Sequence, residues 1–348
     1  MSENNPDWQL RFYREGDIPA LAALINSTVE KDSFGQSYSE ADLAANYSQP
    51  FSDPPNQILI AEGPQVEGVP AGVPPGMARI LWMDDPDAGE RIYQMQVLIH
   101  PAARELGLES LLVPRVMEII RANEAGADLP ARDTVDLIGM AWQQDTFRRG
   151  IYTGLGMHDV RHMWTMERSL DHPLPEPREV EGVSPRIYIR PEDNTAGCEA
   201  YNKSFIDHYG FHLMSQEQWD HYVTRPSARP DLSWVAIIES GPDAGKIAGF
   251  CMCEIDEYDN EQLGKKAGWI GELGVIRGWR GLGLGRSLLL QGMRSLRDAG
   301  LDTAMLGVDT ENPSGATRLY DSVGFTVRDS LIVYKCALKD VLAAEATR

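Results

Sequence analysis

Residues 280–285 read Arg-Gly-Leu-Gly-Leu-Gly, a segment whose glycines could hold a phosphate. The apolar stretch WIGELGV at 269–275 precedes it and predicts a strand, and SLLLQGMRSLRDAG at 287–300 follows it and predicts an amphipathic helix. Glycines let the backbone turn freely and approach an anion closely. The unpaired N–H groups of the first helical turn, together with the helix dipole, would then bind the negative charge. The segment therefore predicts a phosphate cradle between a strand and a helix.

Three kinds of nucleotide-binding loop place glycines in this setting, and the spacing separates them. A Walker loop requires Gly-Lys-Ser/Thr, and no lysine follows Gly285. A dinucleotide fingerprint requires Gly-x-Gly-x-x-Gly after a first strand, whereas Gly281, Gly283 and Gly285 are evenly spaced and lie late in the chain. The third pattern is Arg/Gln-x-x-Gly-x-Gly/Ala, the acetyl-CoA loop of the GNAT superfamily of N-acetyltransferases. The segment that starts at Arg280 resembles this third loop.

A second segment extends the resemblance. TAMLGVDTEN at 303–312 predicts a strand that runs into a loop, and PSGATRLYDSVGF at 313–325 predicts a short helix. GNAT members carry an Asn at the end of this strand, then Leu-Tyr on the helix and then Gly-Phe. The matching positions here are Asn312, Ala316, Leu319, Tyr320, Gly324 and Phe325. The resemblance covers residues 186–338, departs from the usual Pro at Arg277, and implies acetyl-CoA as co-substrate with no metal.

The resemblance also implies which residues contact acetyl-CoA. Backbone N–H groups from Leu282 to Ser287 would bind the pyrophosphate, and the Val275 amide would contact the thioester carbonyl as a one-donor oxyanion hole. Arg280 and Arg286 could pair with phosphates, although Arg286 could equally lie on the helix surface. The full expected set is Leu273, Gly274, Val275, Arg280, Gly281, Leu282, Gly283, Leu284, Gly285, Arg286, Ser287, Asn312, Ala316 and Tyr320.

The same pattern occurs twice in the chain. Residues 99–109 align with 275–285 at an offset of 176 residues, and 152–157 align with 320–325 at an offset of 168 residues. Offsets of this size indicate a duplicated domain and not a solenoid, whose periods are much shorter. The predicted fold class is therefore α/β, with two tandem GNAT domains as in the mycothiol synthase-like tandem proteins. Each domain would be a mixed, mostly antiparallel sheet flanked by helices.

A linker separates the two copies. LDHPLPEPREVEGVSP at 170–185 carries four prolines and four acidic residues without a helical or strand period, which is typical of a stiff, extended segment. The N-terminal domain is therefore expected at 1–169 and the C-terminal domain at 186–348. The expected strands lie at 11–14, 58–63, 77–83, 186–190, 234–240 and 247–255, and the expected helices begin at Asp17, Ser39, Asp193 and Ser215.

The two copies differ at the phosphate loop. The first copy keeps Arg104 and Gly107 but carries Glu105 and Glu109 where the second has glycines. Glu109 would place a carboxylate near a pyrophosphate oxygen, and two unit charges about 4 Å apart repel by roughly 4 kcal/mol at an effective dielectric of 20. We therefore expect the N-terminal domain to be degenerate as an enzyme and the C-terminal domain to be catalytic. Alternatively, the first copy binds CoA through backbone amides without catalysing.

Two residues of the second copy could do the chemistry. N-acetyl transfer needs a neutral amine, and a primary amine with a pKa of about 10.4 is protonated at pH 7. Glu272, a polar residue in an apolar strand, is the candidate base, or else an edge carboxylate that faces solvent or a nearby Arg. Tyr320 lies where family members place a Tyr beside the CoA sulfur, which implies an acid for the departing thiolate; ordinary aromatic packing is the alternative. No Cys has a His in motif spacing, so direct transfer is expected.

The acceptor would meet the loop at 205–219, FIDHYGFHLMSQEQW, which is dense in aromatic and His residues. His208, Tyr209, Phe211 and His212 either line a pocket there or form a packed loop core. The expected activity is transfer of the acetyl group of acetyl-CoA to the amine of a small molecule. A protein or peptide N-acetyltransferase and a non-catalytic CoA-binding regulatory module remain the alternatives.

Composition limits the partners. The 348 residues are 43% hydrophobic and carry a net charge of −20, which disfavours nucleic acid and suits a cationic acceptor, or serves solubility alone. No apolar run reaches about 18 residues, and the N-terminus has no signal-peptide pattern. We expect a cytoplasmic protein, monomer or homodimer, without a membrane partner. The cysteines show no zinc or disulfide spacing, and Cys251 and Cys253 share one strand face as core thiols.

Overall fold

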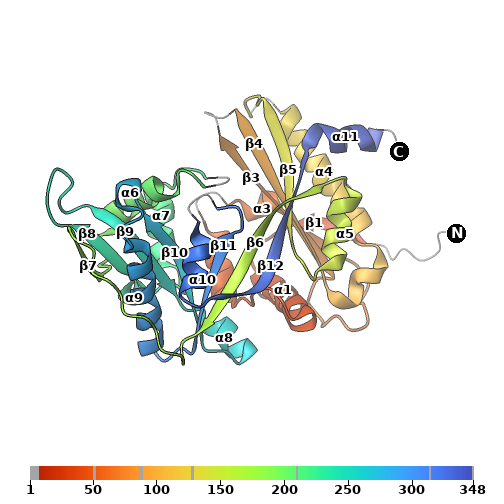
Figure 1. The fold of residues 1–348 in the computed structure, drawn as a ribbon. Helices are drawn as coiled ribbons and strands as arrows, with labels where there is room; N and C mark the ends of the chain where they lie inside the picture. Colours follow the sequence, from red (N-terminus) through yellow and green to blue (C-terminus); the bar gives the residue numbers. More distant parts are fainter. Residues whose placement is uncertain are drawn as a thin grey trace. The chain divides into compact units, whose positions relative to one another are not determined.

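In the computed structural model the chain forms two compact units, shown in Figure 1. The N-terminal unit contains Met1–His162 together with Leu331–Arg348, and the C-terminal unit contains Met163–Ser330. The structure describes residues 8–49, 52–85, 89–126, 129–208, 211–312 and 315–346. Each unit is an α/β fold built on a mixed sheet with helices on both faces, as the sequence predicts.

The N-terminal unit has six strands in the order β1-β2-β3-β4-β5-β12. Its elements are β1 (Gln9–Phe12), α1 (Ile18–Asp32), α2 (Glu40–Tyr47), α3 (Pro54–Gln57), β2 (Ile58–Glu62), β3 (Gly76–Asp85), β4 (Glu90–Ile99), the 3₁₀ turn η1 (Pro101–Leu106), α4 (Glu109–Ala125), β5 (Thr134–Trp142), α5 (Thr146–Gly154), the last half of β12 (Thr326–Ala337) and α11 (Leu338–Ala346). The strands pair antiparallel except β4 and β5, which are parallel.

The C-terminal unit repeats this plan with the order β6-β11-β10-β9-β8-β7. Its elements are the last half of β6 (His158–Ser169), β7 (Val183–Ile187), α6 (Asn194–Phe205), α7 (Gln216–Thr224), the turn η2 (Pro230–Leu232), β8 (Trp234–Ile238), β9 (Ile247–Glu254), α8 (Glu257–Leu263), β10 (Ala267–Val275), the turn η3 (Arg277–Trp279), α9 (Leu284–Asp298), β11 (Thr303–Asp309) and α10 (Ala316–Ser322). Here β10 and β11 are the parallel pair.

The two units exchange their last strands. β6 ends the first copy in sequence, but Met163–Ser169 pair with β11 of the second. β12 ends the second copy, but Leu331–Ala337 pair with β5 of the first, and α11 joins the same core. The units therefore divide at 162/163 and 330/331, which differs from the expected boundary at the linker. Both exchanged strands are 12 residues long, enough for one chain segment to belong to both units.

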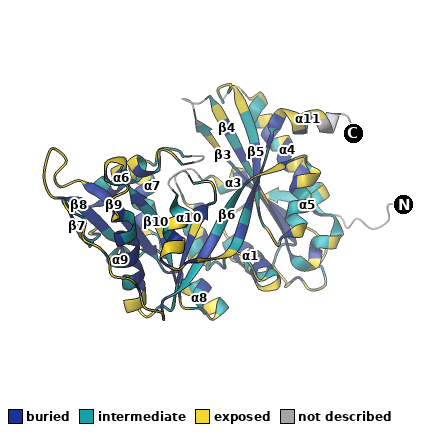
Figure 2. Ribbon diagram, in the orientation of Figure 1, coloured by how far each residue is buried: buried dark blue, intermediate teal, exposed yellow. Residues whose placement is uncertain are grey.

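Each sheet is covered on both faces, and Figure 2 shows the buried strands between their more exposed helices. In the C-terminal unit α9 packs on one face through Leu288, Leu289 and Met293. The other face carries α6 and α7, with Trp219 and Phe250 at the centre of their cluster. Cys251 and Cys253 are both buried on the α9 face, which confirms them as core thiols.

Local sequence signals explain the helix starts. Ser39 caps α2, since its hydroxyl accepts from the Asp42 amide. Ser215 forms a full capping box with Gln218 at the start of α7. The expected strands are also present, each shifted by a few residues at most. Within the described part of the chain, none of the helices is both long and apolar enough to cross a membrane.

Candidate active site

The site begins where β10 and β11 part. The two strands pair only between Ala267–Ile270 and Thr303–Leu306, although β10 continues to Val275 and β11 to Asp309. Beyond the pairing, the Ile276 N–H donates to the Ala248 carbonyl on β9 at 3.0 Å. Backbone groups alternate along a strand, so the Val275 N–H points away from β9 toward the gap. The gap therefore offers the Val275 N–H to an extended ligand, whereas the Val275 carbonyl accepts from Arg280.

The expected phosphate cradle lies at the end of β10. Gly281 and Gly283 have φ of 77° and 87°, a left-handed conformation that side chains with a Cβ rarely adopt, and Gly283 is the N-cap of α9. The first helical hydrogen bond joins the Ser287 N–H to the Gly283 carbonyl at 3.0 Å. The amides before it therefore have no partner within the helix. Gly285 differs from them, because its φ is not left-handed and a Cβ there would make an ordinary van der Waals contact with the Val275 side chain at 3.4 Å.

Arg280 connects this loop to the backbone of β10 and α6. Its Nε donates to the Val275 carbonyl at 2.9 Å, and one terminal nitrogen donates to the Ser204 carbonyl at 2.7 Å. The other lies 3.2 Å from Asp207, which also pairs with Arg277. Each guanidinium nitrogen thus has an acceptor within the protein, and each terminal nitrogen keeps a second N–H, so the expected phosphate contact stays a prediction. Arg277, the departure from the family pattern, ties the loop after α6 to the cradle.

The other expected contacts of the first turn of α9 lie around the same cradle. Leu282 is exposed, Leu284 is buried and Arg286 is half-buried. The Ser287 hydroxyl donates to the Arg178 carbonyl of the linker at 2.8 Å, and the Ser287 N–H donates to the Gly283 carbonyl at 3.0 Å. On β10, Leu273 is half-buried and Gly274 is buried against Phe250, whose ring would be 2.4 Å from an added Cβ.

Glu272 lies on β10 beside a β-bulge. Ile270 and Glu272 pair with neighbouring residues of β9, Cys253 and Met252, so Gly271 is the extra residue. Removal from water raises the pKa of Glu272 to about 8, with a further rise from Glu254 and an opposing effect of Arg225. A carboxyl group with this pKa can exchange a proton near neutral pH.

Four further residues surround Glu272, and none was expected from the sequence. The Tyr222 hydroxyl donates to Glu254 Oε1 at 2.9 Å, and Arg225 forms an ion pair with the same carboxylate. Tyr201 and Tyr222 have pKa values raised by burial and by the charge of Glu272. The sequence carries the same signal for both glutamates, a charged residue in an apolar strand. Glu254 is the charged residue of FCMCEI, and Glu272 is that of WIGELGV.

Tyr320 is buried on α10 and packs edge-on against Phe325, with ring centroids 6.0 Å apart. Burial raises its pKa, and the charges of Cys251 and Glu272 raise it further. The Tyr320 ring packs in the hydrophobic cluster on the α9 face of the sheet. Ala316 lies half-buried one turn earlier on the same helix.

Asn312 and His208 are in contact. Asn312 is expected to bind the cofactor, and His208 is expected to line the acceptor pocket. The Asn312 side-chain amide lies 3.0 Å from His208 Nε2. Burial lowers the pKa of His208, so its imidazole is neutral at pH 7. Phe211 and His212 follow half-buried in the same loop, and Tyr209 falls outside the described residues.

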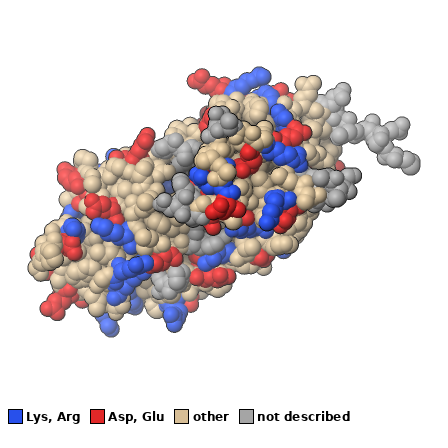
Figure 3. Space-filling view, turned by 90° about the horizontal axis from the view of Figure 1, so that it is seen from above, with Lys and Arg blue, Asp and Glu red and all other residues tan. Residues whose placement is uncertain are grey.

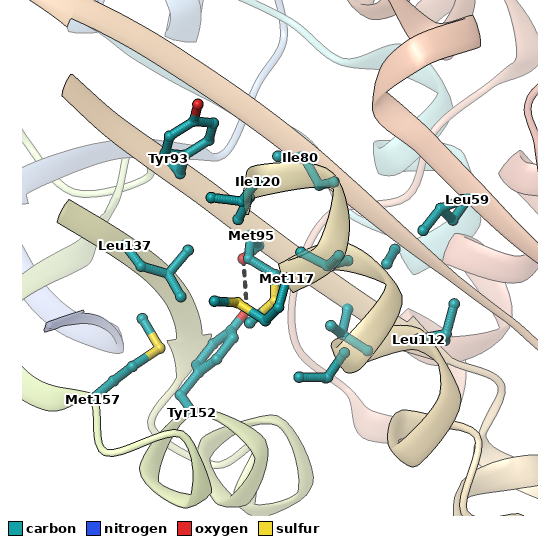
Figure 4. Close-up of a cluster of buried hydrophobic side chains, with 14 of the residues drawn as sticks. Leu59, Ile80, Tyr93, Met95, Leu112, Met117, Ile120, Leu137, Tyr152 and Met157 are labelled. Carbon is teal, nitrogen blue, oxygen red and sulfur yellow. Dashed lines mark hydrogen bonds between the residues drawn. The ribbon is translucent and has the colours of Figure 1, made fainter. Parts of the chain in front are cut away.

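The N-terminal unit shows what a closed version of this site looks like. Gly139 and Tyr152 hold the places that Gly307 and Tyr320 hold in the second copy. The Tyr152 ring would lie 2.6 Å from a Cβ on Gly139, and its hydroxyl donates to the Met95 carbonyl at 3.1 Å, as Figure 4 shows. A Cβ on Gly307 would meet nothing within 4 Å. The gap is filled in one unit and open in the other.

A second side chain closes the N-terminal gap. Arg148, which stands where the second copy has Ala316, donates from Nε to the Val97 carbonyl at 3.1 Å. At the start of α4, one carboxylate oxygen of Glu109 is buried without a hydrogen-bond partner. Arg104 is paired with Asp32, and Gly107 keeps a left-handed φ of 73°. The N-terminal loop retains its shape but carries a negative charge at the helix start.

The surface does not single out one kind of charge. On the face that Figure 3 shows, acidic and basic side chains are interspersed. Among the described residues, no group of three or more His, Cys, Asp or Glu is arranged to hold a metal ion.

Known proteins resemble the chain in sequence and in fold. The Acetyltransferase (GNAT) family pattern matches residues 195–325. A mycothiol acetyltransferase of Thermobispora bispora is 30% identical over 318 residues, which cover 89% of this chain and 93% of that protein. A GCN5-related N-acetyltransferase from Sphaerobacter thermophilus superposes with a TM-score of 0.69 at 24% identity, covering 96% of each chain.

A tandem GNAT protein from the clavulanic acid biosynthesis pathway gives a TM-score of 0.70 at 14% identity, over 95% of this chain and 99% of that one. At these identities the two structural likenesses concern the fold alone, whereas the mycothiol acetyltransferase is a relative over nearly the whole chain. The chain therefore belongs to the GNAT family, as a tandem N-acetyltransferase that uses acetyl-CoA as its co-substrate.

Proposed function

We propose that the C-terminal unit transfers the acetyl group of acetyl-CoA to the cysteinyl amine of desacetylmycothiol, the acceptor that the name of the relatives implies. The observation that carries this proposal is Glu272, whose pKa is raised to about 8 beside the open gap between β10 and β11. An α-amino group has a pKa of about 7.7–8.0. Base and acceptor are therefore matched, and proton transfer between them costs little free energy.

The reaction follows from the positions of the residues. Glu272 takes one proton from the ammonium group, directly or through water, and the neutral amine attacks the thioester carbonyl. The Val275 N–H, which points into the gap, donates to the developing oxyanion. When the tetrahedral intermediate collapses, the C–S bond breaks and Tyr320 gives its proton to the CoA thiolate. The cationic nitrogen loses its second proton, which returns through water to the Tyr320 phenolate, and the neutral amide remains. Backbone amides from Leu282 onward hold the pyrophosphate at the start of α9.

The N-terminal unit takes no part in turnover in this proposal. Tyr152 and Arg148 occupy backbone carbonyls of β4 that would otherwise face the pantetheine arm. Glu109 adds a carboxylate where the phosphates would lie. Three independent side chains thus oppose acetyl-CoA in that unit. Their counterparts in the C-terminal unit are Tyr320, Ala316 and Gly285, and a Cβ on Gly307 there would meet nothing within 4 Å.

The experiment follows acetylation of desacetylmycothiol by mass spectrometry and loss of thioester absorbance. Thiol reagents are unsuitable because both the acceptor and the released CoA carry thiols. The same sugar without its cysteine and a lysine peptide serve as comparison acceptors. Acetylated product from desacetylmycothiol alone supports the proposal, and equal or faster acetylation of the peptide contradicts it. Glu272→Gln should lower the rate by about 10²–10⁴-fold, the usual contribution of a general base.

A further inference from the structure

A second carboxylate lies beside the proposed base. Glu254 ends β9, and its side chain crosses the bulge of β10 at Gly271. A Cβ added at Gly271 would lie 1.7 Å from Glu254 Oε1. Only glycine leaves room for this carboxylate, which lies against Gly271, the residue before Glu272, on the α6–α7 side of the sheet.

Two partners hold Glu254 in this position. The Tyr222 hydroxyl donates to its Oε1 at 2.9 Å, and Arg225 pairs with its Oε2. The Arg225 guanidinium also lies over the Tyr222 ring, 4.4 Å from the centroid. The side chain of Glu254 is only 15% exposed, so this arrangement is largely shielded from water. Charge-assisted contacts of this kind are stronger than neutral ones and fix geometry.

The groups that interact electrostatically with Glu272 come from four elements. Tyr201 belongs to α6, Tyr222 to α7, and Tyr320 to α10, and all three phenols have pKa values raised by burial and by Glu272 itself. They are neutral at physiological pH. The charged neighbours are Glu254 from β9 and Arg225 from the end of α7, which act on Glu272 in opposite directions. The cluster holds two carboxylates and one guanidinium, so one more cation would balance its charge when both carboxylates are ionised.

We propose that Glu254 is a positioning residue for the proposed base: fixed by Arg225 and Tyr222 over Gly271, it sets the protonation of Glu272 and adds a negative charge that draws the ammonium group of the acceptor. The inference rests on the proposed function of Glu272. A like charge nearby disfavours the ionised form of a carboxyl group, and an opposite charge favours it. Binding of the ammonium group then supplies the missing cation and ionises Glu272 when the acceptor arrives.

The test compares pH profiles of kcat and of kcat/KM for charge variants of the full chain. Glu254→Gln should move the acid limb of kcat/KM to lower pH by about one unit, because the like charge is gone. It should also raise KM for the amine acceptor. Arg225→Gln should move the limb to higher pH, because Glu254 then acts unopposed. Glu254→Asp keeps the charge and should keep the limb near its wild-type position. Glu239→Gln, an exposed glutamate after β8, is the matched control and should change neither.

Opposite shifts in the two charge variants support the inference, because a merely structural role would lower the rate without moving the limb in a charge-ordered way. Shifts of the same sign, or none, overturn it. If Glu254→Gln does not fold, the sign of the Arg225→Gln shift decides alone. If Glu272→Gln is slow but the acid limbs of Glu254→Gln and Arg225→Gln do not move, this inference alone is contradicted. A fully active Glu272→Gln variant overturns both this inference and the proposed base.

Discussion

The Tyr152 hydroxyl donates a hydrogen bond to the Met95 carbonyl across 3.1 Å and so closes the gap between β4 and β5 in the N-terminal unit. The equivalent Tyr320 accepts from the Val323 and Phe325 N–H groups through its backbone carbonyl, whereas its hydroxyl has no hydrogen bond within the described part of the C-terminal unit. One residue type, conserved in place by the duplication, therefore has two structural outcomes. In one copy it satisfies a strand carbonyl that would otherwise need water or a ligand. In the other its hydroxyl stays available at the site.

Acetyl-CoA should bind once per chain. The filled gap at Tyr152, the Arg148 contact with Val97 and the carboxylate of Glu109 all oppose binding in the N-terminal unit. Isothermal titration calorimetry measures the stoichiometry directly. Two sites of equal affinity would contradict the proposed division of labour between the units.

The phosphate cradle can be tested at Gly283 with two substitutions that separate charge from strain. Gly283 has a φ of 87°, and an added Cβ would meet nothing within 4 Å. Gly283→Ala should therefore cost only backbone strain, about 1–2 kcal/mol, and change acetyl-CoA affinity less than tenfold. Gly283→Glu adds a carboxylate beside the pyrophosphate and should weaken binding by about 10³-fold. Calorimetry with both variants decides, and near-wild-type affinity of Gly283→Glu would rule out the cradle.

The sequence was sufficient to predict elements whose signals are local. Ser215 and Gln218 announce the start of α7 because a capping box needs only four adjacent residues. The glycines of the cradle are equally predictable, since a left-handed φ favours glycine at that one position whatever its distant neighbours are. The alternation of FCMCEI likewise places Cys251 and Cys253 on one face.

Features that depend on distant partners were not predictable in this way. The exchange of β6 and β12 is decided by which sheet edge each strand meets, and the duplication gives the two strands the same local pattern. Arg280 matches an acetyl-CoA motif, yet its guanidinium also donates to the Ser204 carbonyl, 76 residues away in sequence. Glu254 meets Tyr222 only because a bulge at Gly271 re-aims β10.

Tyr152, the counterpart of Tyr320 in the N-terminal unit, provides a matched control for the proposed acid. Tyr320→Phe removes the proton donor for the thiolate and should lower kcat by about 10²-fold. Tyr152→Phe removes a chemically identical hydroxyl that bonds to the Met95 carbonyl, so it should cost about 1 kcal/mol of stability and leave kcat unchanged. Steady-state kinetics and thermal melts of both variants separate the roles. An equal loss of rate in the two variants would contradict the acid role of Tyr320.

Glu272 should lower the free energy of unfolding by an amount that depends on pH. Its pKa rises from about 4.3 in an unfolded chain to about 8 in the folded state because the site is shielded from water and lies near Glu254. Between these two values the folded state binds more protons than the unfolded state. The free energy of unfolding therefore falls as pH rises from about 4.3 to 8, and is constant with respect to this group outside that window.

Glu272→Gln removes this penalty, because glutamine does not ionise. The variant should match the wild type in Tm near pH 4 and exceed it increasingly up to pH 8, by roughly 10 °C. Differential scanning calorimetry across this range gives the two curves, and Glu239→Gln provides an exposed control that should follow the wild type throughout. A Tm difference that stays constant with pH would mean that Glu272 titrates alike in the folded and unfolded chain, and would remove the physical basis for its role as a base poised near neutrality.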